Sequence, residues 1–365
     1  MISTISCKKD KLEGFEENRT FKNYSASFKN DGKKNWSDCL NGVDIICGNV
    51  LSFNDFNHFL SVYTCLESAY EHWNDSIENE YSSLNDDDYN QLWEDNGWDE
   101  DYQFVQFENH LNHNSLRAML ATIEDAWMDD PDNMPDTDDY DFFDDDVMNT
   151  LWSADYNIKI GNNLYHIFPN GRVLEVDNAD CQLFFSSIAD SSVNHPNARL
   201  GGPIIPNPSI DIDPTCWKWG WERNYRVPNN AHNHHDTTIN GKLYASRFKA
   251  RASSYYVPGP IWFHKMHTKL KLYVPKRNGY GGFKKFRTDI DGFGISGRYY
   301  DGSNSCTPIP NNPVGSTKPR KRRSKYYTAL TNYYPLVWIA IKKDEVNAAF
   351  TLPGIGYSQL LTLRK

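Results

Sequence analysis

Apolar residues early in the chain recur every three or four positions, the spacing that places side chains on one face of an α-helix. The first such stretch begins at Leu51 and runs to about residue 78. Ser52 followed by Asp55 fits a capping box, and Leu51 with Phe56 fits a hydrophobic staple. We therefore predict a long helix whose aromatic face packs in the core. Its apolar positions are Phe56, Phe59, Leu60, Tyr63, Leu66, Tyr70 and Trp73.

The segments around this helix carry weaker signals. Residues 8–40 are polar and rich in Lys and Asn, which is typical of a flexible tether. Residues 81–106 are acidic and aromatic, and we expect short helices or irregular structure there. A second amphipathic helix is predicted from Ser115 to Trp127, because its apolar residues share one face. These residues are Leu116, Met119, Leu120, Ile123 and Trp127.

After residue 150 the pattern changes to alternation, which predicts strands. Residues 157–160, 163–168 and 172–176 fit a three-stranded meander, with Asn170-Gly171 as a strong type I′ turn signal. Residues 187–214 are rich in Pro, Asn and Gly and predict a long connection. Further strands are predicted at 242–256, 261–274, 294–300, 334–342 and 357–363.

This order of elements predicts an α+β protein, with an N-terminal helical part followed by a β-rich C-terminal part that resembles a sandwich or an open barrel. We divide the chain into a signal remnant and flexible tether at 1–40, a helical acidic part at 41–150, and a β-rich part with basic loops at 151–365. No run approaches the ~18 apolar residues of a membrane-spanning helix.

Charge is distributed unevenly between these parts. Residues 75–146 carry 24 Asp and Glu against one basic residue, Arg117, whereas residues 217–365 carry 26 Lys and Arg against 7 acidic residues. Oppositely charged parts of one chain attract each other, so we expect them to dock. The formal net charge of −10 disfavours approach to a polyanion, so we expect no nucleic-acid partner. We assign the basic run at 318–325 to a solvated loop.

The N-terminal residues contain a candidate lipidation site. The tripeptide Ile5-Ser6-Cys7 resembles the end of a bacterial lipoprotein signal, in which a small residue precedes the lipid-modified cysteine. The Lys-Lys-Asp that follows, and the polar tether, resemble exported lipoproteins of Bacteroidota. Fewer residues precede Cys7 than the roughly 7–15 apolar residues of a signal peptide core. This interpretation therefore predicts an apolar leader encoded ahead of the first residue, and the alternative is a frayed tail with one thiol.

A second segment resembles the same group of proteins. Leu151-Trp152 and the run from Ile158 to Ile167 resemble a segment that recurs in uncharacterised Bacteroidota lipoproteins. The resemblance covers residues 1–180 approximately. It implies attachment to a membrane through a lipid on Cys7, a location at the bacterial outer membrane or cell surface, and no known activity. A polysaccharide or another envelope protein would then be the partner.

The other six cysteines are an even number, which allows up to three disulfides in an oxidising compartment. The alternative is that they are buried, reduced thiols. The sequence leaves the pairing open. These cysteines are Cys39, Cys47, Cys65, Cys181, Cys216 and Cys306.

The densest group of potential metal ligands is His232, His234 and Asp236. On an extended segment, residues i and i+2 lie on the same side about 6–7 Å apart, so this group could hold a transition metal. His264 and His267, near a later predicted strand, are further candidates. We favour the alternative of a solvated polar loop, and therefore expect no cofactor.

The Asp-rich residues 129–146 are a second candidate for cation binding, because calcium prefers clustered carboxylates. The segment lacks the Gly and Glu positions of an EF-hand. We favour a solvated acidic loop and leave weak Ca²⁺ binding open.

Trp217, Trp219 and Trp221 alternate along the sequence, so an extended backbone would place all three on one face. If exposed, such a face stacks on sugars or binds cations. If buried, it is half of a sheet core, which is the commoner arrangement.

From these features we expect a non-catalytic envelope lipoprotein that acts as a surface binding or structural module. One alternative is a secreted metal-dependent hydrolase that uses His232, His234 and Asp236. Another is a cytoplasmic or phage structural protein with reduced thiols. The G-x-S-x-G and Walker motifs of common enzyme classes are absent from the sequence.

Overall fold

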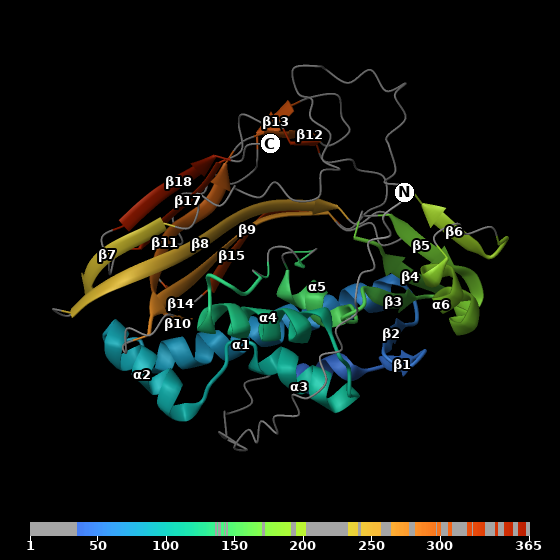
Figure 1. Ribbon diagram of the computed structural model, residues 1–365, viewed down its shortest axis with the longest axis horizontal. Coiled ribbons are helices and arrows are strands. Elements are labelled where there is room, and N and C mark those ends of the chain that lie inside the picture. The colour runs from blue at the N-terminus through green and yellow to red at the C-terminus, as the bar shows by residue number, and fades with distance from the viewer. Residues whose placement is uncertain are drawn as a thin grey trace, which may run out of the picture. The chain divides into compact units, whose positions relative to one another are not determined.

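The computed structural model describes residues 35–201, with gaps at 136, 138–139, 142, 144, 170–171 and 191–194. Beyond residue 201 it describes the strands β7–β18 and, between them, residues 276, 282 and 286–287. Side chains are described up to residue 200 and again at 271–274, 276 and 282–289. Residues Lys33–Lys365 form one compact unit. Apart from two short strands near residue 50, the helices precede most of the strands along the chain, which confirms the predicted α+β class (Figure 1).

The long helix α1 (Phe56–Glu80) begins later than the capping pattern predicts. Its N-cap is Asp55, whose carboxylate accepts a hydrogen bond from the backbone N–H of His58 at 2.8 Å. The predicted capping box and staple are wrong, because Ser52 belongs to a buried strand, β2 (Val50–Phe53). Strand pairing at this segment outweighs the local helix-capping signal.

The second predicted helix is confirmed as α4 (Leu116–Asp129), whose N-cap Ser115 accepts a backbone hydrogen bond at 3.0 Å. The acidic segment before it contains two regular helices, α2 (Asp86–Asn96) and α3 (Tyr102–Leu111). Gly97 ends α2 in the left-handed conformation that favours glycine, with a φ of 61°. No helix among the described residues is long and apolar enough to span a bilayer.

A six-stranded sheet occupies residues 44–201, and its strands follow one another in sequence order. Strands β3, β4 and β5 confirm the predicted meander. Strand β2 pairs with β3 in parallel, with Phe53 opposite Ile160, so the helices α1–α5 form one excursion between two adjacent strands. The strands are β1 (Asp44–Ile46), β2, β3 (Asn157–Ile160), β4 (Asn163–Ile167), β5 (Val173–Val176) and β6 (Ala198–Gly201).

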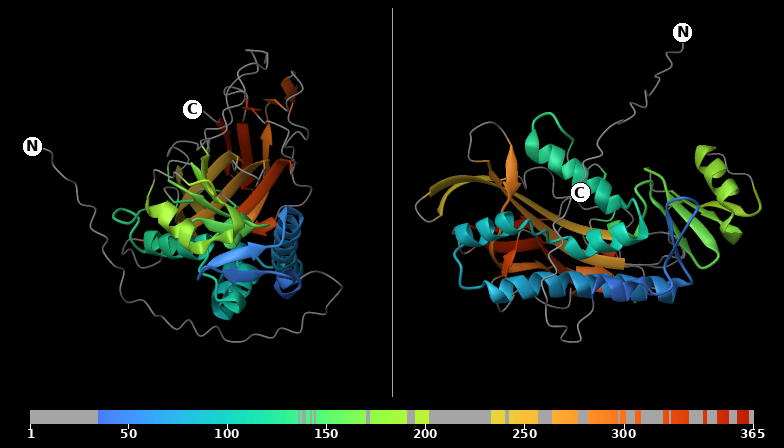
Figure 2. Two further views of the ribbon diagram at one scale, coloured as in Figure 1. Left: turned by 90° about the vertical axis from the view of Figure 1, so that its right-hand side faces the viewer. Right: turned by 90° about the horizontal axis from the view of Figure 1, so that it is seen from below.

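The two faces of this sheet contribute to different apolar clusters. One face packs with α1, α3, α4 and α5 (Asp146–Leu151) into the main core, and α1 lies beside α3 (Figure 2). The other face packs against α6 (Cys181–Ala189). Alternation along the strands produces this division. Leu51, Phe53, Ile158, Ile160, Tyr165 and Ile167 belong to the main core, whereas Val50, Leu164, Leu174, Val176 and Phe184 belong to the second cluster.

Beyond residue 232 the described elements are strands. A five-stranded sheet has the order β10-β9-β8-β7, and β15 also pairs with β9. Its strands are β7 (Asn233–Ile239), β8 (Lys242–Tyr256), β9 (His264–Pro275), β10 (Phe283–Lys285) and β15 (Ser324–Asn332).

Two smaller sheets contain the remaining strands. One has the order β14-β11-β17-β18 and the other β13-β12-β16. The loop predicted at 318–325 is wrong in part, because β14 and the start of β15 lie within it. The strands are β11 (Thr288–Ser296), β12 (Arg298–Tyr300), β13 (Cys306–Pro308), β14 (Arg320–Arg322), β16 (Ala340–Ile341), β17 (Asn347–Leu352) and β18 (Tyr357–Thr362).

Candidate functional site

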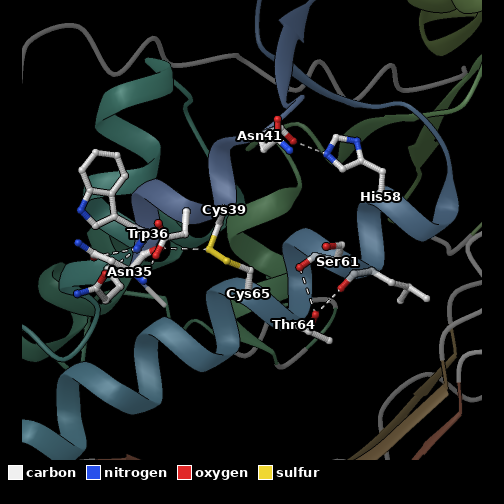
Figure 3. The surroundings of a disulfide bond; sticks show 11 residues. Asn35, Trp36, Cys39, Asn41, His58, Ser61, Thr64 and Cys65 are labelled. Carbon is white, nitrogen blue, oxygen red and sulfur yellow. Dashed lines mark hydrogen bonds between the residues drawn. A yellow bond between two sulfur atoms is a disulfide. The ribbon is translucent and has the colours of Figure 1, made fainter. Parts of the chain in front are cut away.

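Two disulfides join the first described residues to later helices. Cys39, in the 3-10 helix η1 (Trp36–Leu40), bonds to Cys65 of α1, with 5.6 Å between their Cα atoms, and both side chains are buried (Figure 3). Cys47 bonds to Cys181 at the start of α6, with Cα atoms 5.5 Å apart. Disulfides of this kind are expected in an oxidising compartment. The side chains of the other two candidate cysteines lie outside the described part.

The helix η1 is ordered by its cap and by α3. The Asn35 side chain accepts a hydrogen bond from Trp36 N–H at 2.8 Å (Figure 3). The Asp38 carboxylate accepts one from Asn35 N–H at 2.8 Å. Trp36 N–H also donates to Gln103 Oε1 of α3 at 3.0 Å. Residues 36–40, which polarity placed at the end of the tether, therefore form part of the folded body.

Arg287 is a deeply buried charge between the helices and the described C-terminal strands. Its Nε donates to Glu100 Oε1 at 3.0 Å, and its guanidinium carbon lies 4.0 Å from the centre of the Trp93 ring. The Arg287 and Glu100 side chains are 6% and 3% exposed. Because an unpaired charge is costly in such surroundings, each group depends on the other.

Helix α2 also binds the backbone around Arg287. The Asn90 amide donates to the Arg287 carbonyl at 2.7 Å and accepts from the Arg287 N–H at 2.8 Å. The Thr288 hydroxyl donates to Asp86 Oδ2 at 2.6 Å. These three hydrogen bonds fix the position of α2 along this segment.

Helix α4 contacts strands β9 and β10 next to this site, through the carboxylate of Glu124 and the ring of Trp127. Glu124 accepts hydrogen bonds from Lys271 Nζ at 2.9 Å and from the Tyr273 hydroxyl. The Trp127 ring packs edge-on against Tyr273 and parallel to Phe283, with ring centres 5.1 and 5.8 Å away. These contacts confirm that the acidic and basic parts of the chain dock.

A second buried ion pair lies within the helical part. Arg117 Nε donates to Glu108 Oε1 at 2.8 Å, its Nη2 donates to the other carboxylate oxygen, and the Ser115 hydroxyl also donates to Glu108. Burial, together with the neighbouring Asp99 carboxylate, raises the pKa of Asp101 to about 6, although the Arg117 charge acts in the opposite direction. This network stabilises the junction between α3 and α4.

A small acidic hollow lies between α1, α3 and α5. Its volume is about 40 Å³, whereas clefts for organic ligands measure roughly 300–1,000 Å³. The rings of Tyr70 and Phe104 stack on each other in its wall, with centres 5.0 Å apart. Its size suits a water molecule or a single small ion. The other lining residues are Glu67, Glu71, Asp145, Asp146 and Val147.

The structure describes some of the residues that the sequence singled out. His234 and Asp236 lie in β7, so the solvated loop favoured for this segment is wrong and its backbone is extended. Among the described residues, no three His, Cys, Asp or Glu side chains are grouped to hold a metal. Cys7, Trp217, Trp219, Trp221 and His232 lie outside the described residues.

Strand register separates the two histidine groups. His234 is opposite Arg247 on β8, whereas His267 is opposite Ser253 on the same strand. Six residues of strand separate these positions, which is a distance of about 20 Å. His264 lies still further along β9. Neither His264 nor His267 can therefore complete a metal site with His234.

Sequence reasoning missed Arg287 and its partners. Arg287 is 187 residues from Glu100, and nothing local to either residue indicates the contact. The difference in charge between the two parts of the chain is the one signal that could have directed attention to it. That signal predicts docking but does not identify residues.

No family model matches the chain, and no curated protein is similar to it. A solved structure described as a DUF4848 family protein from Bacteroides thetaiotaomicron matches at 11% sequence identity and a TM-score of 0.16, covering 87% of this chain and 98% of that chain. We infer neither fold nor function from a match with a TM-score this low.

Proposed function

We propose that the chain is a bacterial envelope protein, held at the outer membrane or cell surface by a lipid on Cys7, that acts as a binding or structural module. The observation that carries this proposal is the buried Cys39–Cys65 disulfide, which the Cys47–Cys181 bond accompanies. Structural disulfides persist outside the reducing cytosol and are rare within it. The envelope location is therefore inferred from the oxidising compartment that these two disulfides require.

A lipid anchor on Cys7 would limit the distance between the folded body and the membrane. The flexible tether predicted between Cys7 and the folded body would comprise residues 8–34. A flexible segment of this length has a root-mean-square extension of about 30 Å. The body would then reach partners beyond the membrane surface while staying attached to it.

The buried charges support a binding or structural role. Arg287 pairs with Glu100, and Arg117 pairs with Glu108. Such pairs fix the arrangement of helices and strands, because each group leaves a buried charge when its partner is removed. For the ligand we propose a polysaccharide, which would stack on Trp217, Trp219 and Trp221.

Lipid attachment is tested on the protein expressed from its native reading frame, including whatever precedes the first residue. Radiolabelled palmitate should enter the protein in the membrane fraction, and Cys7→Ala should abolish the label. Cys306→Ala is the matched control and should keep it. Mature protein that retains an unmodified Met1 would refute the anchor.

The disulfides are tested by alkylating the native protein without reductant and mapping its peptides. We expect linked peptides that contain Cys39 with Cys65 and Cys47 with Cys181. Four alkylated thiols at these positions in protein from the native host would remove the basis for an envelope location.

Polysaccharide binding is tested by calorimetry against a panel of purified bacterial and plant polysaccharides. Any binding should be lost in the Trp217→Ala/Trp219→Ala/Trp221→Ala variant while the melting temperature stays the same. Trp36→Ala, which removes an indole ring elsewhere, is the control and should retain affinity. No binding across the panel would favour a structural role.

A further inference from the structure

The described ion pairs between the helical part and residues 271–289 all have the same arrangement of charge. In each of their described ion pairs, the acid belongs to the helical part and the base to the strand segment. Two of these pairs lie deep in the contact and two at its rim. The pairs are Lys271–Glu124, Lys276–Asp129, Lys284–Glu94 and Arg287–Glu100.

The backbone register of β8 and β9 places further basic residues at positions of the same face. Lys271 and Tyr273 both meet Glu124, so their positions belong to the face of β9 nearest α4. Alternate residues of a strand, and directly paired residues of antiparallel strands, share a face. The basic positions that belong to this face are therefore Lys265, Lys269 and Lys271 on β9, with Arg247, Lys249 and Arg251 on β8.

The four ion pairs differ in their exposure to solvent. Lys276 and Asp129 are 45% and 70% exposed, and Lys284 and Glu94 are similarly open, whereas the Arg287–Glu100 pair is almost fully enclosed. Salt screens exposed pairs strongly and buried pairs weakly. The contact therefore combines a salt-sensitive rim with a salt-resistant centre at Arg287.

We propose that these four ion pairs form an ionic latch between the helical part and the C-terminal strands, and that the latch opens from its rim inward as ionic strength rises. The pairs of Lys276 and Lys284 weaken first, and the Arg287–Glu100 pair separates last. The open form exposes the basic side chains of these four pairs without unfolding α1. Apolar contacts of Trp127 persist in salt, so the open form is a minor state. This conformational device is independent of lipid attachment.

Hydrogen exchange of the full chain tests the latch, because the Arg287 N–H is bonded to Asn90 across the contact. Raising sodium chloride from about 0.1 to about 1 M shortens the Debye length from ~10 to ~3 Å. The two rim pairs contribute to the free energy of full opening, so screening them should accelerate exchange of the Arg287 N–H by about 3- to 30-fold. Exchange at 59–66 in α1 should stay the same. Equal rates at both salt concentrations, or equal acceleration of both segments, would overturn the proposal.

Charge reversal provides a second test at low salt. Lys284→Glu should accelerate exchange at residues 286–288, and the added Glu94→Lys should restore the original rate. The control is Arg199→Glu, which reverses an exposed charge that pairs with Asp177 outside this contact, and it should leave these residues unaffected. Failure of the double variant to restore protection would count against the latch.

Discussion

The guanidinium group of Arg287 lies over the Trp93 ring, 4.0 Å from the ring centre, while its Nε donates to Glu100. The ring provides a negative face for the cation, and the carboxylate accepts a hydrogen bond at its edge. The charge is therefore satisfied from two directions at a place that water scarcely reaches. This arrangement explains how a strand segment with a buried arginine can pack on helices.

Replacing Arg287 by methionine should lower the free energy of unfolding by about 3–5 kcal/mol, because it leaves Glu100 buried without its partner. Urea denaturation followed by fluorescence measures the loss. The double variant Arg287→Met/Glu100→Met removes both charges and should recover part of it. A single-variant loss below about 1 kcal/mol would mean that water reaches the pair in solution.

Gly282→Ala should destabilise the protein more than Gly48→Ala. Both glycines have positive φ, 121° and 88°, but a Cβ on Gly282 would lie 2.8 Å from the Met128 carbonyl oxygen, whereas a Cβ on Gly48 meets nothing within 4 Å. We expect each variant to lose about 1 kcal/mol from backbone strain, and Gly282→Ala to lose roughly 1–3 kcal/mol more from the clash. Thermal unfolding of both variants measures the difference, and equal losses would contradict the close contact with α4.

Removing the two disulfides separately should have different costs. Cys39–Cys65 closes a loop of 26 residues and Cys47–Cys181 one of 134. A longer closed loop restricts the unfolded chain more, so the paired alanine variants should lose about 3 and about 5 kcal/mol respectively. Urea unfolding without reductant measures both losses. A change below about 1 kcal/mol in both variants would indicate that neither bond restricts the unfolded chain.

Acid should destabilise the protein as the pH falls from about 6.5 to about 4. Burial lowers the pKa of His113 and of His166 from 6.5 to about 4. In this window the unfolded chain binds protons that the folded chain does not, so the free energy of unfolding falls with pH. Asp101, with its raised pKa, opposes the effect between about pH 4 and 6.

His166→Gln tests this assignment, because glutamine keeps a polar group near Asn157, which lies 2.8 Å from His166 Nδ1. The slope of unfolding free energy against pH should decrease in the variant between pH 4 and 6.5. An unchanged slope in His166→Gln would show that His166 titrates normally.

The elements that could be predicted from the sequence are those with local signals. Ser115 caps α4 through its own side chain, and alternation within short segments locates the meander β3–β5. Ser52 shows the limit of such signals, because its capping pattern is overridden by pairing with Lys159, 107 residues away. Tertiary pairing outweighs local preference there, and a single sequence does not reveal it.

The features of the candidate site also divide into those that the sequence predicts and those that it does not. The number of cysteines allows disulfides, and the opposite charges of the two parts of the chain predict that they dock, because both inferences depend only on composition. Which cysteine meets Cys39, or which carboxylate meets Arg287, depends on how the chain returns on itself. The sequence favours a loop at His234, because Pro228, Asn229 and Asn230 precede it. Pairing with β8 makes this segment a strand instead.

The parallel pairing of β2 with β3 has a consequence for biosynthesis. Strand β2 leaves the ribosome 107 residues before its neighbour at Lys159, a delay of roughly 5–20 s at ordinary elongation rates. Throughout that interval the four residues Val50–Phe53, all buried in the finished protein, lack one flank of their sheet. Until residue 160 has been made, the edge of β2 that later pairs with β3 keeps its backbone groups unpaired, which is the condition in which strands aggregate most readily.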